Sequence, residues 1–254
     1  MKTVLRILML SVAFLTGAIP LCAQKQRLQN IPYIDQRRVH YGFMLGLTAV
    51  DANFEHAPGA EWFAEAPNVD ASFCVGLLGD LALTEHLSLR CTPSLYFQTR
   101  EVTMRHLLAV RPDLAVPVPD PETGEALPPS VPRDVRQSIR STYMELPVTL
   151  KVSTRRLNNY RPYMAFGVGL WYDWGHEKET PLVFNRWDVG LHVAMGCDGY
   201  LPFFKFCPEL RFNWGLLDML DHKRAGLKDP TLMQYTDAIT RARNKSVSLI
   251  FYFE

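Results

Sequence analysis

The sequence predicts an all-β chain: an eight-stranded antiparallel transmembrane up-and-down β-barrel whose interior is filled by side chains. The clearest signal is Tyr143–Trp174, which has the pattern of two membrane-length strands joined by a polar turn at Ser153–Tyr160. Apolar residues alternate with polar or small ones in both limbs, and aromatic residues end the second, as expected for strands with one face in lipid. The chain is 48% hydrophobic, yet no apolar run after residue 23 reaches the roughly 18 residues of a membrane-spanning helix.

The N-terminal residues have the composition of a secretory signal peptide. Lys2 and Arg6 precede an apolar run at Ile7–Leu15. Cys22 leaves a lipoprotein as the alternative, although the residue before it is larger than a lipidation motif prefers. The predicted parts are a signal peptide at 1–23, a periplasmic leader at 24–36 and an outer-membrane β-barrel domain at 37–254.

Each of the eight predicted strands alternates with a period of two, and strong apolar rows occupy one face. The connections alternate long and short, as in a barrel with both termini in the periplasm, short turns inside and long loops outside. The first and last strands should pair, because an open strand edge cannot be left in lipid. The predicted strands are about Val39–Asn53, Val69–Leu83, Leu87–Met104, Tyr143–Val152, Arg161–Trp174, Trp187–Tyr200, Lys205–Leu217 and Lys245–Glu254.

Three long connections are predicted without strands. Glu55–Asn68 contains two prolines and a glycine and has the composition of a loop. Arg105–Gln137 contains seven prolines, which should exclude regular structure across it, and we expect it outside the cell. Asp218–Asn244 is polar, with room for one helical turn.

Polar residues on the inward rows make up the main candidate site. We expect Glu145 to form an ion pair with Lys151 or Arg211 in the interior. A soluble lipocalin-like barrel is the structural alternative, but it would bury the apolar rows inside and leave no low-cost place for these charges. The predicted interior polar network is Arg90, Glu145, Lys151, Asp173, Asp188, His192, Glu209 and Arg211, with Asp198 also on an inward row.

No catalytic arrangement is evident, and we expect the protein not to be an enzyme. Asp188 and His192 share a face but lie roughly 13 Å apart at about 3.3 Å per residue, too far for a dyad. Asp173 and His176 fit a solvated rim better than an active site. Gly167 is followed by no helix start that would make a phosphate site, so with Gly169 it should give the strands room to curve or pack.

The cysteines and the seven histidines show no metal-ligand spacing, so no metal or cofactor is expected. We expect free buried thiols at the cysteines that remain after signal cleavage, with two disulfides as the alternative. Mature-chain charge is balanced, because loss of two basic residues from 27 leaves 25 against 26 acidic ones. That balance excludes a nucleic-acid partner, and no small-molecule substrate is expected. The cysteines are Cys74, Cys91, Cys197 and Cys207.

Four segments together resemble the PorT family of Bacteroidetes outer-membrane barrel proteins, over nearly the whole mature chain. They are QNIPYIDQRRVHYGFMLGL at 29–47, YMELPVTLKV at 143–152, RPYMAFGVGL at 161–170 and NKSVSLIFYF at 244–253. The resemblance implies a part in type IX secretion, which exports cargo with C-terminal sorting domains and is linked to gliding in some species. It implies other type IX secretion components as partners, beside outer-membrane lipid. It supplies no catalytic or metal residues.

The segment just before the first strand, Gln29–Tyr41, is polar and contains a proline. We expect its Asp35, Arg37 and Arg38 to dock a periplasmic-side component of the secretion machinery. One alternative function is an adhesion or recognition barrel that acts through its long outer loops. A barrel enzyme that modifies lipid or peptide at the outer rim is the other.

Overall fold

The computed structural model describes residues 30–65, 70–110, 118–119, 126–127, 134–175, 182–222 and 232–254. The predicted signal peptide and residues 24–29 of the predicted leader lie outside the described residues.

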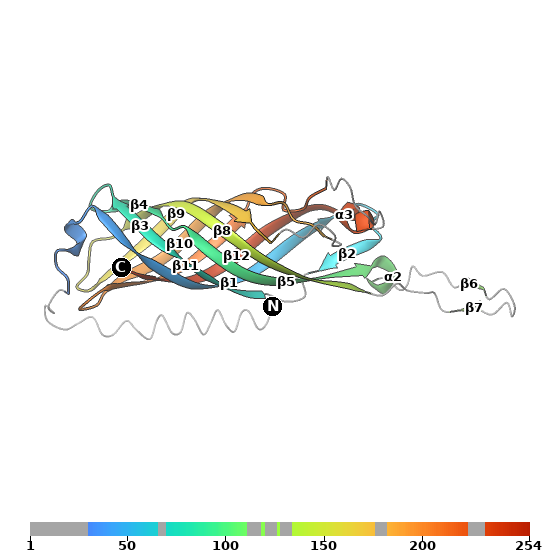
Figure 1. Cartoon of the computed structure of the whole chain (residues 1–254), viewed down its shortest axis with the longest axis horizontal. Helices are drawn as coiled ribbons and strands as arrows, with labels where there is room; N and C mark the ends of the chain where they lie inside the picture. Colours follow the sequence, from blue (N-terminus) through green and yellow to red (C-terminus); the bar gives the residue numbers. More distant parts are fainter. Residues whose placement is uncertain are drawn as a thin grey trace.

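The described chain is almost entirely antiparallel sheet (Figure 1). Ten strands form one sheet, and β6 and β7 form a separate pair. The elements are η2 Ile34–Gln36, β1 Val39–His56, β2 Trp62–Glu65, β3 Asp70–Ala82, β4 Leu87–Cys91, β5 Ser94–His106, α2 Leu107–Val110, β6 Val118–Pro119, β7 Ala126–Leu127, β8 Val135–Ser153, β9 Tyr160–Asp173, β10 Trp187–Tyr200, β11 Lys205–Gly215, α3 Met233–Asp237 and β12 Ile239–Phe253.

The strand pairings return to their starting point. The sheet order is β1-β12-β11-β10-β9-β8-β4-β3-β5-β2, with additional pairings β1–β3 and β8–β5. Phe43 of β1 is opposite Phe253 of β12 on one side and Leu77 of β3 on the other. The predicted pairing of the first strand with the last is therefore confirmed.

The predicted count of eight strands is not confirmed, because the sheet has ten. The predicted third strand is divided into β4 and β5, both of which pair with β3 and β8. Pro93 stands at the division and lacks the N–H that a ladder needs, while its carbonyl accepts from the Leu77 amide at 2.9 Å. The tenth strand is β2, which lies within Glu55–Asn68, the segment predicted as a loop. It pairs with β5.

Three strands are longer than predicted: β1 has 18 residues, β8 has 19 and β12 has 15. They connect two ends of the molecule. We call the end that carries η2 and the C terminus the leader end, and the end that carries β2, α2 and α3 the loop end (Figure 1). A membrane-crossing strand needs only about 9–11 residues, so these strands are long enough to continue beyond a bilayer.

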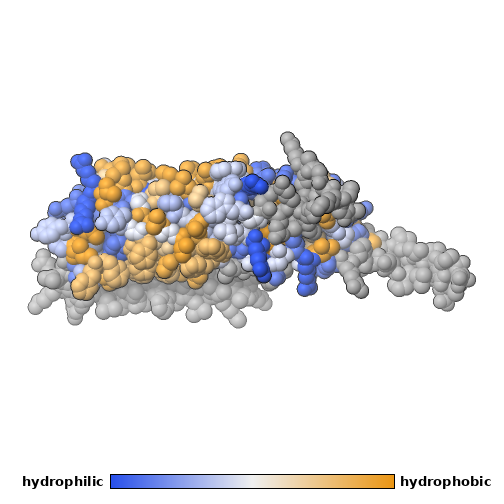
Figure 2. Space-filling view, in the orientation of Figure 1, coloured by the Kyte–Doolittle hydropathy of each residue, from blue (hydrophilic) through white to orange (hydrophobic). Residues whose placement is uncertain are grey.

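The outer face of the sheet changes character along these strands. In β1, Leu47 is exposed on the outer face, but further towards the loop end the exposed positions are Asp51 and Glu55. The inner face changes in the opposite direction, from Thr48 to Ala52, both buried. In Figure 2, apolar residues gather over the wall from the leader end to about its middle, and hydrophilic ones become common towards the loop end.

Apolar side chains inside the loop end form a core of their own. Its members come from β1, β2, β5, β12 and the connections between strands, and they exclude water from the inside of the strand extensions. The buried members are Ala52, Trp62, Ala64, Val102, Met104, Leu182, Met219, Leu220, Ala238, Ile239 and Ala242.

The Pro-rich segment Arg105–Gln137 is more ordered than predicted. It holds the end of β5, the short helix α2, the two-residue strands β6 and β7, and the start of β8 at Val135. Pro119 is compatible with β6 because a proline is tolerated in a short edge strand. The helical turn expected within Asp218–Asn244 is confirmed as α3, although β12 already begins at Ile239.

Candidate functional site

Charged side chains inside the leader end form a chain of ion pairs. Lys151 Nζ lies 2.7 Å from Asp198 Oδ2, which is also 3.5 Å from Lys205 Nζ. Lys205 continues to Glu254 at 2.9 Å, and Glu254 to the His40 imidazole at 2.6 Å. Burial raises the pKa of the Glu254 carboxyl, but the neighbouring His40 and the charge of Lys205 lower it more, to about 2 in balance.

A second group of ion pairs is centred on Arg90, whose side chain is fully buried. Arg90 lies 3.0 Å from Asp80 and 3.1 Å from Glu209. Glu209 also pairs with Arg211 at 2.9 Å and accepts from the Tyr163 hydroxyl at 2.9 Å. Asp80 was absent from the predicted network, although it is opposite Arg90 in the β3–β4 register.

Glu145 takes a different partner from the one predicted. Its Oε1 lies 3.3 Å from Nε2 of His192, and Nδ1 of that ring lies 2.6 Å from Asn213 Oδ1. The predicted pairing with Lys151 fails because six residues along one strand separate the two by roughly 20 Å. The predicted pairing with Arg211 fails because that guanidinium is held by Glu209.

Asp188 and Gly169 are two further interior residues whose roles were predicted from the sequence. Asp188 is buried and accepts from the backbone amides of Val189 and Leu217, at 2.8 and 3.3 Å, so it makes no dyad with His192. A Cβ at Gly169 would overlap the His192 ring, which bears out the expectation that this glycine makes room inside.

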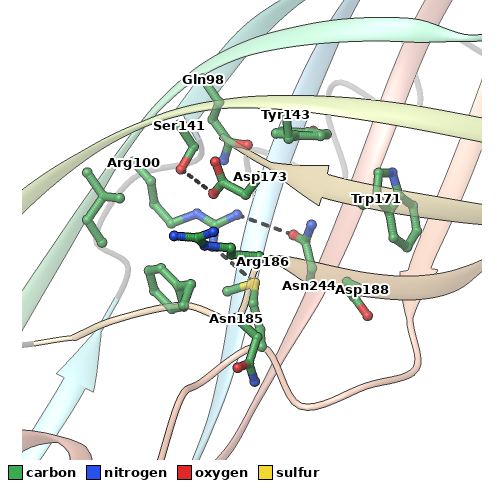
Figure 3. Close-up of a pocket in the computed structure, with 13 residues that line it drawn as sticks. Gln98, Arg100, Ser141, Tyr143, Trp171, Asp173, Asn185, Arg186, Asp188 and Asn244 are labelled. Atoms are coloured by element: carbon green, nitrogen blue, oxygen red, sulfur yellow. Dashed lines mark hydrogen bonds between the residues drawn. The ribbon is translucent and has the colours of Figure 1, made fainter. Parts of the chain in front are cut away.

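A small cavity of about 60 Å³ lies between the polar interior and the loop-end core (Figure 3). Asp173, half-buried, accepts there from Ser141 Oγ at 2.9 Å and from the Gly175 amide at 2.8 Å. No histidine is among the described residues that line it. His176, the predicted rim partner of Asp173, lies outside the described residues. The lining is Gln98, Arg100, Ile139, Ser141, Tyr143, Trp171, Asp173, Phe184, Asn185, Arg186, Asp188, Met219 and Asn244.

At the leader end of the barrel, the Asp35 carboxylate is one of the groups that hold the leader in place. Asp35, in η2, lies 3.4 Å from a guanidinium nitrogen of Arg156 and 3.4 Å from one of Arg161. It also accepts from the Tyr200 hydroxyl at 2.7 Å. Asp35 is therefore an intramolecular anchor of the leader rather than a free docking group. We call Asp35, Arg156, Arg161 and Tyr200 the leader latch.

Arg156 is the centre of the latch. Its guanidinium carbon lies 3.6 Å from the centre of the Tyr200 ring, and its Nε donates to the Asn158 carbonyl at 2.8 Å. The two terminal nitrogens donate to the backbone carbonyls of Asn30 and Ile31. A planar guanidinium with five donors is suited to hold a chain in this way, which a lysine could not do.

Under the leader lies a polar cavity of about 370 Å³, bordered by Asp80, Lys151, Asp198 and Lys205. The latch thus covers the exposed end of the interior ion pairs. Arg37 and Arg38 follow η2 and are exposed, and within the described part of the chain neither side chain forms an ion pair. Sequence reasoning identified Asp35, Arg37 and Arg38 but not the two arginines that hold Asp35, which are Arg156 in the β8–β9 turn and Arg161 near the start of β9. The only feature of the sequence that points to these two arginines is their spacing in RRLNNYR at 155–161.

Other possible sites can be assessed over the described ranges. The four cysteines are free thiols there, as expected, so the disulfide alternative is wrong. No group of three His, Cys, Asp or Glu residues could hold a metal ion. No helix among the described elements is long and apolar enough to cross a membrane.

Similarity to known proteins is clearest at the level of the family. The family model for the outer membrane protein β-barrel domain matches residues 22–221. No curated protein matches the chain. Among solved structures, the chain is similar to Neisserial surface protein A, with 8% identity, a TM-score of 0.42, and 85% of this chain and 98% of that one covered. It is also similar to OprG of Pseudomonas aeruginosa, with 12% identity, a TM-score of 0.45, and coverage of 85% and 91%. The chain belongs to the outer membrane protein β-barrel domain family, which places it in the outer membrane.

Proposed function

We propose that this protein is an accessory component of type IX secretion, needed for export of cargo that carries a C-terminal sorting domain. The observation that carries the proposal is the latched leader, which holds Arg37 and Arg38 beside the mouth of the barrel, with no ion-pair partner for either in the described ranges. The sequence resemblance to the PorT family supplies the secretion system. The protein is not an enzyme in this proposal.

The sheet acts in this proposal as one transmembrane barrel with eight wall positions, because β4 and β5 share one position and β2 is a short strand paired with β5 at the loop end. Both termini, and hence the leader end, are periplasmic. A barrel of this size is filled by its own side chains, and the buried ion pairs around Arg90 and Asp198 occupy this one. Folded cargo therefore does not pass through it, and its contribution comes from its surfaces.

The docking partner is a periplasmic-side secretion component with an acidic surface. Arg37 and Arg38 are exposed and adjacent, and a complementary carboxylate surface would be attracted to both. The latch makes this contact specific in position, because Asp35 fixes η2 just before the two arginines.

Charge reversal of both Arg37 and Arg38 to Glu tests the proposal. We expect sorting-domain cargo to accumulate in the periplasm while the amount of assembled barrel is unchanged. Reversal of Arg136 and Arg140, exposed on β8 towards the loop end, is the matched control and should leave secretion normal. Normal secretion by an assembled double variant at 37 and 38 would remove the leader from the mechanism.

A recognition or adhesion barrel is the second candidate function. The observation in its favour is the aromatic and charged cavity of Figure 3, which lies next to a loop end with its own core. Gene deletion separates the candidates: lost adhesion with normal secretion supports the second. Altered lipid or peptide products would instead support a rim enzyme.

A further inference from the structure

A groove of about 440 Å³ lies outside the barrel mouth at the leader end. The leader forms one side of the groove, and the first residues of β1 form the other. Phe203, in the β10–β11 turn, closes the groove at one end. The groove meets the chain of interior ion pairs at His40 and Glu254, which line it. Its lining is Ile31, Pro32, Tyr33, Ile34, Arg37, Val39, His40, Tyr41, Phe203 and Glu254.

The apolar side of the groove continues the outer wall. Val39 and Tyr41 are 59% and 76% exposed, and they begin the same outward row as Phe43. Phe43 stacks on Phe253 with ring centres 4.9 Å apart. Phe203 is 94% exposed. Rings that are costly to leave in water but carry or adjoin polar groups are typical of the interface between lipid tails and headgroups.

The polar side of the groove carries one guanidinium, that of Arg37, and one carboxylate, that of Glu254. Arg37 has no ion-pair partner among the residues that the structure describes. The nearby carboxylate of Glu254 is already shared between Lys205 and His40. A ligand that fills the groove therefore meets an uncompensated guanidinium at one end and apolar wall at the other.

We propose that this groove binds a phospholipid of the periplasmic leaflet, with its phosphodiester on Arg37 and its acyl chains along Tyr41 and Phe43. The assignment rests on the proposed periplasmic placement of the leader end. A phosphodiester accepts charge-assisted hydrogen bonds from a guanidinium in a bidentate manner. Continuity with the lipid-facing row favours a lipid over a peptide, because acyl chains already cover that row in an outer-membrane protein.

Native mass spectrometry of the full chain, purified from outer membranes in detergent and titrated with dioleoylphosphatidylglycerol, tests this site. We expect one tightly retained lipid and an affinity about fivefold lower in Arg37→Gln, the effect of losing one basic residue at an anionic lipid surface. The matched control is Arg38→Gln, because Arg38 is adjacent and exposed but does not line the groove. Its affinity should be unchanged.

Equal losses in both variants would show general electrostatic attraction and overturn the site. Retention of dioleoylglycerol, which lacks the phosphate, as firmly as the phospholipid would overturn the role of Arg37. Tyr41→Ala provides a second test of the apolar side and should also weaken retention, with heat-modifiable migration confirming that the barrel is folded. Lipid binding is measured without the secretion machinery, so normal secretion by the double charge-reversal variant would refute the docking proposal and leave this result intact.

Discussion

The two halves of the long strands present opposite kinds of residue on their outer face. Towards the leader end, β1 and β12 present apolar residues outward, and Leu47 is paired with Leu249. Four positions further along β1, Asp51 is paired with Lys245, and both are exposed. The strands are continuous across this change, so secondary structure is not what differs. What differs is the surrounding medium, because an outward apolar row is stable in lipid and an outward charged pair is stable in water.

The interiors of the two halves also differ in the kind of side chain that they bury. Inside the leader-end half, the buried charged groups form ion pairs, which lowers the cost of burying them, and they lie beside a buried cluster that includes Met44, Leu78 and Ile250. Inside the loop-end half, an apolar core fills the strand extensions, because there the outer surface meets water and the hydrophobic effect can operate. One continuous sheet thus combines a membrane barrel with a water-soluble extension.

The largest effect is expected from the leader-end interior. Replacing Asp198 by Asn leaves Lys151 and Lys205 buried without their shared carboxylate, which should cost about 3–5 kcal/mol of unfolding free energy. The control is Glu65→Gln at the loop end, whose pair with Arg105 is roughly half exposed and should contribute less than about 1 kcal/mol. Denaturant unfolding in lipid vesicles measures both. Similar losses would contradict the difference between the two halves.

The outer face gives the next largest effect. Leu150→Arg places a charge in the apolar outward row and should cost about 2–4 kcal/mol near mid-bilayer. Ser138→Arg, on the outer face of the same strand at the loop end, should change stability by about 0.5 kcal/mol at most. Residue 138 is opposite Glu101, which suits an arginine. The heat-modifiable fraction in gels is the readout, and equal losses would mean that both positions meet the same medium.

A smaller and local effect is expected in the loop-end core. Ile239→Val removes one buried methylene and should cost about 0.5–1.5 kcal/mol. Because this core is separate from the membrane part, hydrogen exchange should quicken at the start of β12 and not at Leu249 in the same strand. Uniform quickening along β12 would show that the two halves open together.

The smallest effect is expected at the latch. Asp35→Asn weakens its pairs with Arg156 and Arg161, and a partly exposed ion pair contributes about 1 kcal/mol or less. Amides in η2, including Gln36, should exchange faster, while Arg211 in the barrel wall keeps its protection. Unchanged exchange in η2 would show that the backbone contacts of Arg156 hold the leader without the carboxylate.

Much of the fold could be predicted from period-two alternation. The β9 and β10 spans, and the pairing of first and last strands, follow from apolar rows that must face lipid. The extensions of β8 and β12 could not be predicted this way. There the outward residues are polar and the inward row mixes apolar residues such as Ile139 with polar ones such as Ser141, so the pattern no longer matches a lipid-facing strand. The division at Pro93 was also missed, because one proline does not interrupt the apolar row.

For the candidate site, the sequence predicts which side of its strand each residue faces but not which residue it pairs with. Alternation identified inward charges such as Glu145 and Lys151, because a single strand determines which side they face. Their partners lie on other strands, and cross-strand register decides the pairing, as with Asp198 opposite Arg161 and within reach of Lys151. The latch depends on contacts between residues more than 120 positions apart, such as Asp35 and Arg156, which local sequence does not encode.

Cysteine accessibility along the outer face of β8 shows where this strand passes from lipid into water. In a background without Cys74, Cys91, Cys197 and Cys207, single cysteines replace Ser138, Leu146 or Leu150, and intact cells are treated with a membrane-impermeant maleimide. We expect labelling at 138 and none at 146 or 150. Labelling at 138 only after the outer membrane is permeabilised would invert the topology, and equal labelling at all three positions would refute the change of medium along the strand.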